Sequence, residues 1–104
     1  MKRQEVVCGL RQATDGCEAA DTLVNWACAL YALGRFDRAE SAARHALARA
    51  PGLLRAQYVL GLALMAQEKS QEECLRALDN AAAEFPKARE FAARIRQRLQ
   101  ASAR

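Results

Sequence analysis

The sequence predicts an all-α protein, and three observations lead to this prediction. Alanine supplies 24 of the 104 residues, whereas Val, Ile and Thr together supply only seven. Alanine favours helices because it loses no side-chain freedom there, while strands need β-branched and aromatic side chains. Apolar residues also recur every three to four positions, which is the period of a helical face. The breaks between such segments are only a few residues long, and this predicts antiparallel neighbouring helices.

Start and stop signals divide the chain into six expected helices. A Ser or Asp followed three residues later by Glu fits a capping box, in which two side chains bind free backbone N–H groups. Gly34 fits a left-handed helix end, and Pro51 and Pro86 suit a break or a first helical position. The capping-box pairs are Asp15–Glu18, Asp37–Glu40 and Ser70–Glu73. The expected helices cover residues 3–14, 16–33, 37–50, 53–67, 70–85 and 87–101.

Each of the later helices has one apolar face that we expect to be buried. Many of these positions hold alanine, and small side chains let two helix axes approach closely. The helix at 16–33 has Leu23, Trp26, Ala27, Leu30 and Leu33, and the next has Ala39, Ala43, Ala46, Leu47 and Ala50. The faces further along hold Leu60, Ala63 and Leu64, then Cys74, Leu78, Ala81 and Ala82, and finally Phe91, Ala92, Ile95 and Leu99.

Two segments of the chain repeat each other. Pro51 and Pro86 lie 35 residues apart, and each closes a pair of helices. Residues 23–30 superpose on residues 57–64 at a spacing of 34, and the second helices superpose at a spacing of 35. One extra residue therefore lies in the turn of the second pair. A period near 34 with two helices per unit is typical of a repeat array.

At these positions the sequence resembles the tetratricopeptide repeat family, whose pattern is W-x2-L-G-x2-Y, then A-x3-F-x2-A and a closing P. The Trp and Tyr of that pattern are replaced in both units, and its Gly occurs once, as Gly61. The first unit holds Leu23, Trp26, Ala27, Leu30, Ala39, Ala43, Ala46 and Pro51 at the eight positions. The second unit holds Gln57, Leu60, Gly61, Leu64, Cys74, Leu78, Ala81 and Pro86.

We therefore expect a single domain over residues 1–104, built as a helix-turn-helix repeat array (an α-solenoid) of about six antiparallel helices. Such arrays usually need about three units, so helices at both ends would cover the exposed faces. Dimerisation is a second way to cover them, and an unrelated helical bundle is the rival fold. The expected parts are repeat one at 20–53, repeat two at 54–86, a flanking helix at 3–14 with Val6, Leu10 and Ala13 inward, and a capping helix at 87–101.

The residue inventory argues against an enzyme. The chain has one histidine, His45, and it has no Gly-rich phosphate loop or nucleophile motif. We therefore expect no catalytic residue and no cofactor. The four cysteines form no CxxC pair and lie far from His45 in sequence, so we expect no metal site and reduced thiols. A disulfide between Cys8 and Cys17 is the alternative for that pair.

The charge pattern argues against nucleic acid as a partner. The net charge is +4, and residues 87–104 alone contribute +5. Arg94 and Arg98 share one helical face, but Arg96 points elsewhere, so the charges form a solvated cap and not a stripe. No apolar run approaches the roughly 20 residues of a membrane span. We expect a cytoplasmic protein that does not cross a membrane.

The resemblance implies that the first helix of each pair lines a concave groove that binds another protein. Contiguous apolar surface usually marks a binding site, and Tyr and Met supply adaptable contact area. Arg55 and Arg94 could meet acidic groups, whereas the chaperone-tail carboxylate clamp of some family members is incomplete here. The expected groove residues are Val24, Asn25, Tyr31, Arg55, Tyr58, Val59, Leu62, Met65 and Arg94.

The expected function is therefore a protein–protein interaction module that binds a peptide or helical segment of a partner. The alternative is a self-associating assembly or secretion-chaperone-like subunit, which would make the chain a homo-oligomer. Burial in a closed bundle is the competing explanation for the apolar groove positions.

Overall fold

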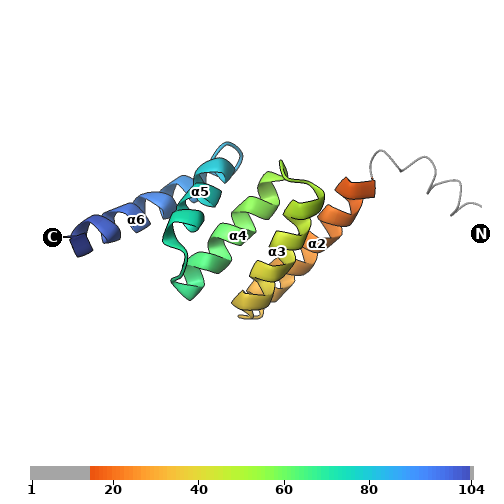
Figure 1. The fold of residues 1–104 in the computed structure, drawn as a ribbon, viewed down its shortest axis with the longest axis horizontal. Helices are drawn as coiled ribbons and strands as arrows, with labels where there is room; N and C mark the ends of the chain where they lie inside the picture. Colours follow the sequence, from red (N-terminus) through yellow and green to blue (C-terminus); the bar gives the residue numbers. More distant parts are fainter. Residues whose placement is uncertain (1–14, 104) are drawn as a thin grey trace, which may run out of the picture.

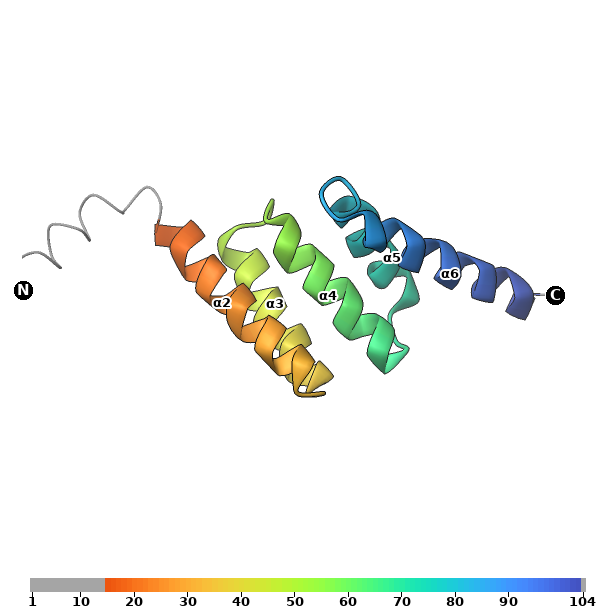
Figure 2. The ribbon, with the colours of Figure 1, turned by 180° about the vertical axis from the view of Figure 1, so that it is seen from behind.

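The computed structural model describes the backbone of residues 15–103 and the accessibility of residues 19–102. Over this range the protein is all-helical, which confirms the predicted fold class, with five helices and no strand. The helix expected at 3–14 lies outside the described residues. Figures 1 and 2 show the helices following one another in a row, with α2 and α3 at one end and α6 at the other. The helices are α2 (Asp15–Ala32), α3 (Phe36–Arg49), α4 (Leu54–Gln67), α5 (Gln71–Ala81) and α6 (Pro86–Ala103).

Helix ends follow the predicted glycine and proline signals closely. Gly34 has a φ of +82°, the left-handed conformation that ends α2 without steric cost. Pro51 lies in the turn after α3, and Pro86 is the first residue of α6. The predicted end of α5 at residue 85 is wrong, because this helix ends at Ala81. A residue before proline is disfavoured in helical conformation, so the chain leaves the helix before Phe85.

The capping boxes expected for α3 and α5 do not form. Arg35 occupies the N-cap of α3, and Asp37 instead accepts a hydrogen bond from the backbone N–H of Arg38 at 2.8 Å. Ser70 is the N-cap of α5, but its φ is +51° and its side chain makes no capping hydrogen bond. Both glutamates of these pairs are engaged elsewhere, as described below. The side chains of the Asp15–Glu18 pair lie outside the described residues.

The core consists mainly of alanine and leucine, so the helices pack at close range. Helices adjacent in sequence contact each other, and α2 also contacts α4. A Cβ atom built on Gly61 would lie 2.7 Å from Cδ2 of Leu78, whose side chain is fully buried. The family-pattern glycine therefore permits the close approach of α4 and α5. The largest fully buried side chains are Leu64, Leu78, Ile95, Val24 and Cys74.

Three residues expected on buried faces are exposed. Trp26 is 59% exposed, Leu33 is 71% exposed and Leu99 is 38% exposed. Trp26 and Leu33 lie on the side of the first pair where no described helix packs. Leu99 lies near the free end of α6. Apolar periodicity identifies a face that could be buried, but a neighbour must be present to cover it.

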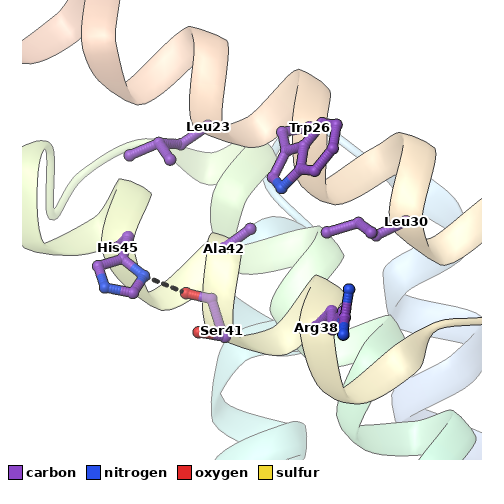
Figure 3. Close-up of a pocket in the computed structure, with 7 residues that line it drawn as sticks. All are labelled: Leu23, Trp26, Leu30, Arg38, Ser41, Ala42 and His45. Carbon is purple, nitrogen blue, oxygen red and sulfur yellow. Dashed lines mark hydrogen bonds between the residues drawn. The ribbon is translucent and has the colours of Figure 1, made fainter.

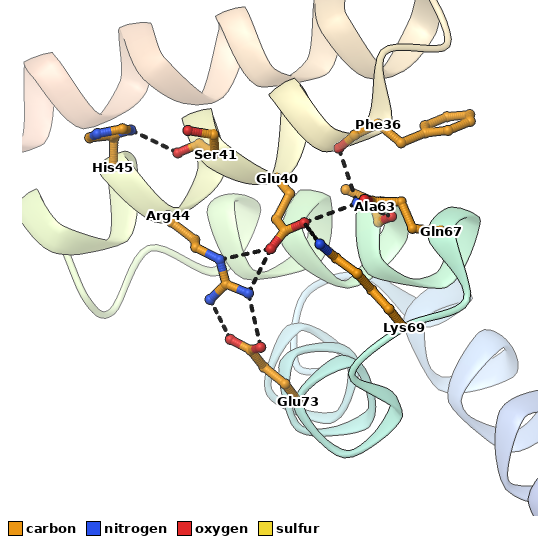
Figure 4. A network of polar contacts seen from close by, with 9 residues as sticks. All are labelled: Phe36, Glu40, Ser41, Arg44, His45, Ala63, Gln67, Lys69 and Glu73. Atoms are coloured by element: carbon orange, nitrogen blue, oxygen red, sulfur yellow. Dashed lines mark hydrogen bonds and ion pairs between the residues drawn. The ribbon is translucent and has the colours of Figure 1, made fainter.

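A polar network joins the first helix pair to the second (Figure 4). The Arg44 guanidinium on α3 donates to both oxygens of Glu73 on α5, at 2.5 and 2.9 Å, and to Glu40 at 2.8 and 3.0 Å. Gln67 and Lys69 approach the other oxygen of Glu40 at 3.0 Å each. Charge-assisted, bidentate hydrogen bonds of this kind fix geometry as well as adding stability. The network therefore sets how the two pairs sit against each other.

The carboxyl groups of this network are held in their ionised form. Burial alone would raise the pKa of Glu40, but hydrogen bonds from Arg44, Lys69 and Gln67 outweigh it and lower the pKa below its ordinary value. The hydrogen bond from Arg44 likewise lowers the pKa of Glu73. The same pairing with Glu73 raises the pKa of Arg44.

Candidate binding surfaces

The first helices of the two pairs, α2 and α4, lie side by side and contact each other. Figure 2 shows α2, α4 and α6 on the same side of the row, with α3 and α5 behind them. Arg55 on α4 donates a hydrogen bond to the amide oxygen of Asn25 on α2 at 2.7 Å. A second nitrogen of Arg55 lies 3.9 Å from Oδ1 of Asp21. Two of the predicted site residues, Asn25 and Arg55, therefore connect the helices directly.

Apolar side chains of intermediate exposure lie on the same two helices. Tyr31, Tyr58, Leu62 and Met65 are each partly accessible, and neither the core nor solvent surrounds them completely. Tyr58 stacks on Phe85, with ring centroids 4.7 Å apart and an interplanar angle of 10°. Such stacking fixes the orientation of the ring. The four side chains therefore present partly accessible apolar area, with the Tyr58 ring held in place by Phe85.

The environment of Tyr58 keeps its hydroxyl neutral. Burial raises the pKa of Tyr58, and Tyr31 on α2 and Glu90 on α6 raise it further. The charged phenolate is disfavoured by a less polar surrounding and by neighbouring negative charge. Tyr58 is therefore a neutral hydroxyl that can both donate and accept a hydrogen bond.

Two predicted groove residues are buried. Val24 is 0% exposed and Val59 is 5% exposed, so neither side chain is accessible on an open surface. Val24 lies four residues after Ala20 and three before Ala27, both of which are in the core. Val59 lies three residues after Ala56 and four before Ala63, which are also in the core. Each valine thus belongs to the buried stripe of its helix, and the expectation that it lines a groove is wrong.

The last predicted site residue, Arg94, is exposed on α6. Its guanidinium carbon lies 6.0 Å from the centroid of the Phe91 ring, at the limit of a cation–π contact. Phe91 is itself partly buried against the core. Arg94 is therefore accessible to a ligand, although its described contact is within its own helix.

A second surface was not predicted as a site. An open cleft of about 300 Å³ lies between α2 and α3 (Figure 3). Trp26 and Leu30 project into it from α2, while α3 supplies the polar residues Arg38 and His45. Nδ1 of His45 lies 2.8 Å from the carbonyl oxygen of Ser41 one turn earlier. The full lining of this α2–α3 cleft is Leu23, Trp26, Leu30, Arg38, Ser41, Ala42 and His45.

The internal repeat contains the signal that could have identified this cleft. Trp26 superposes on Leu60, which is only 4% exposed. Leu60 lies on α4, against which α3 packs. Trp26 has no such neighbour among the described residues, so its face stays accessible. Comparing each residue with its counterpart one repeat later would have separated covered from uncovered faces.

Metal ligation and thiol chemistry find little support among the described residues. The described residues contain no group of three His, Cys, Asp or Glu side chains that could hold a metal ion. Cys28 and Cys74 are free thiols, and Cys28 is exposed. Burial raises the pKa of Cys74 to about 11, and its Sγ lies 3.2 Å from the carbonyl oxygen of Gly61. A buried, protonated thiol is a poor nucleophile.

None of the described helices combines the length and the apolar character that crossing a membrane requires. Comparison with curated proteins finds no match to the chain. A family model does match: residues 20–53 fit the tetratricopeptide repeat, which covers most of α2, all of α3 and the following turn. Repeats of this family generally mediate protein–protein interaction, and the family is not catalytic. The match confirms the resemblance seen in the sequence: this chain carries a tetratricopeptide repeat at residues 20–53.

Proposed function

We propose that the chain is a protein-interaction module that binds a peptide or helical segment of a partner protein. The proposed site is the α2–α4 surface, defined by Asn25, Tyr31, Arg55, Tyr58, Leu62 and Met65. The observation that carries the proposal is that Arg55 and Asn25 join α2 to α4 beside partly exposed apolar side chains. A repeat of a protein-binding family contributes one of these helices.

Binding would combine apolar burial with a few directed hydrogen bonds. Leu62 and Met65 would contribute apolar area, at roughly 25 cal/mol for each Å² removed from water. Arg55 uses part of its guanidinium on Asn25, and its remaining donors could meet a carboxylate of the partner. Arg94 could contribute a second positive charge from α6. The preferred ligand is thus an apolar segment that carries acidic groups.

Affinity capture from the source organism, with the full chain as bait, tests this proposal. Leu62→Asp places a charge in the middle of the α2–α4 surface and should reduce capture at least tenfold, because an unpaired charge resists burial. Leu99→Asp is the matched control, since Leu99 is also apolar and exposed but lies far along α6. Circular dichroism would establish that both variants keep their helicity. Equal capture by the original chain and the Leu62→Asp variant would contradict the proposal.

A further inference from the structure

The α2–α3 cleft has a counterpart one repeat later in the same molecule. A cleft of about 260 Å³ lies between α4 and α5, and α3 with its following turn adds Leu47 and Pro51 as an extra wall. Six of the seven residues of the α2–α3 cleft superpose on residues of this second cleft at the repeat spacing of 34 or 35. These pairs are Leu23 with Gln57, Trp26 with Leu60, Arg38 with Glu73, Ser41 with Arg76, Ala42 with Ala77 and His45 with Asn80.

The second repeat shows how a helix occupies such a surface. Helix α3 packs there so that Leu60 is 4% exposed, whereas its counterpart Trp26 is 59% exposed. Arg44 of α3 binds Glu73, and Glu40 of α3 accepts a hydrogen bond from Gln67. Helix α3 thus covers the apolar side chain of Leu60 and forms polar contacts with Glu73 and Gln67 around it.

The α2–α3 cleft differs from its counterpart on α4 and α5 in charge and in apolar character. Arg38 stands where the second repeat has Glu73, which reverses the charge opposite the incoming helix. Leu23 replaces Gln57, and Leu33, which is 71% exposed, replaces Gln67. A helix packed on the α2–α3 cleft in the way that α3 packs on α4 and α5 would therefore differ from α3. It would need an acidic side chain where α3 has a basic one, and it would need more apolar side chains.

We propose that the α2–α3 cleft binds an amphipathic helix of a partner protein, placed as α3 is placed on α4 and α5. The helix carries a carboxylate opposite Arg38, at the position that Arg44 holds in α3. An apolar side chain takes the position of Glu40 and faces Leu33, and another takes the position of Leu47 and covers Trp26. The proposal concerns a different surface from the α2–α4 surface and goes beyond the function proposed above.

The first residues of the chain fit this requirement less well. At the repeat spacing of 34, Val6 and Ala13 hold the positions of Glu40 and Leu47 and are apolar as required. Leu10, however, holds the position of Arg44, so no carboxylate would oppose Arg38. Residues 1–14 carry three basic side chains against one acidic side chain, Glu5. Charge complementarity therefore favours a separate, acidic helix over this segment.

Two synthetic peptides can test the proposal with the full chain. Both have the sequence of α3 (Phe36–Arg49) with E40L, and one of them also carries R44E. Trp26 is the only tryptophan of the protein and neither peptide contains one, so its fluorescence reports binding in the cleft. We expect a blue shift on binding and about five-fold tighter binding of the peptide with R44E, the size of a well-placed ion pair. Arg38→Glu in the protein should reverse this preference.

Several outcomes would overturn the proposal. Equal binding of the two peptides, no binding of either, or an unchanged preference in the Arg38→Glu variant would each exclude the predicted charge pairing. Iodide quenching of Trp26 fluorescence, measured without peptide, shows whether the protein itself already covers the cleft. Protection of Trp26 from iodide at every protein concentration would indicate that the chain's own first residues occupy the cleft. Protection that grows with protein concentration would indicate that a second copy of the chain occupies it. The Leu62→Asp variant should bind the peptide normally, which separates failure here from failure of the proposed function.

Discussion

At the residue scale, the distance between the second pair of helices depends on one glycine. Gly61 lies in the middle of α4, where glycine costs up to about 1 kcal/mol relative to alanine in helix propensity. Its absent side chain leaves room for Leu78, which is fully buried. Close packing therefore outweighs helix propensity at this position.

Gly61→Ala should consequently destabilise the protein despite its better helix propensity. We expect a net loss of about 1–3 kcal/mol, because overpacking a buried site forces neighbouring side chains or helices apart. Urea denaturation followed by circular dichroism measures this loss. Gly52→Ala is the control, since a Cβ atom there meets nothing within 4 Å. Unchanged stability in the Gly61→Ala variant would mean that α4 and α5 are further apart than described.

Individual residues also show what could not be predicted from the sequence. Tyr31, Leu62 and Met65 were placed on an accessible surface by the family's repeat positions, and their partial exposure agrees with that. Val24 and Val59 were expected beside them, although both lie at buried helical spacing. Residues adjacent in sequence point about 100° apart around a helix. A surface assigned from adjacent positions therefore includes some residues that face the core, and only the packing of the helices shows which ones.

At the element scale, helix ends were predictable where backbone geometry fixes them. Gly34 and Pro86 act through their own φ angles and through the missing N–H of proline, which depend little on the surroundings. Capping boxes depend on side chains that have other possible partners. Glu40 and Glu73 bind Arg44 between helices instead of turning back to their own N-termini, and no local pattern indicates that choice.

The Arg44 network gives the contact between α3 and α5 a predictable pH dependence. The pKa values of Glu40 and Glu73 are lowered in the folded protein, so their contribution to stability is present above the ordinary glutamate pKa of about 4.5. This contribution is lost as the pH falls through the lowered values. Acid should therefore weaken the contact between the two helix pairs.

Arg44→Gln should reduce stability at neutral pH by about 1 kcal/mol, an estimate kept small because Arg44 is partly exposed. The variant should also lose less stability than the original chain between pH 6 and pH 3, because the pKa shifts of its glutamates are smaller. Urea midpoints across this pH range measure both effects. Arg49→Gln, on the same helix and exposed, provides the control. A parallel pH profile for Arg44→Gln and the original chain would contradict the role given to this network.

At the scale of the whole molecule, the array offers two different surfaces. The α2–α4 surface is built from successive helix pairs, and its residues were assigned from the resemblance to the repeat family. The α2–α3 cleft lies at the end of the row, where its accessibility depends on whether another helix precedes the first repeat. Periodicity alone predicted that Trp26 is buried, because it describes the interior of an array better than its ends.

The central claim is that a partner protein binds across α2 and α4, and methyl NMR tests it most directly. The captured partner segment would be titrated into the full chain with labelled Leu and Met methyl groups. We predict that the resonances of Leu62 and Met65 shift or broaden with increasing partner, while those of Leu99 stay unchanged. Shifts confined to Leu99, or to Leu23 and Leu30 of the α2–α3 cleft, with Leu62 and Met65 unaffected, would contradict the account.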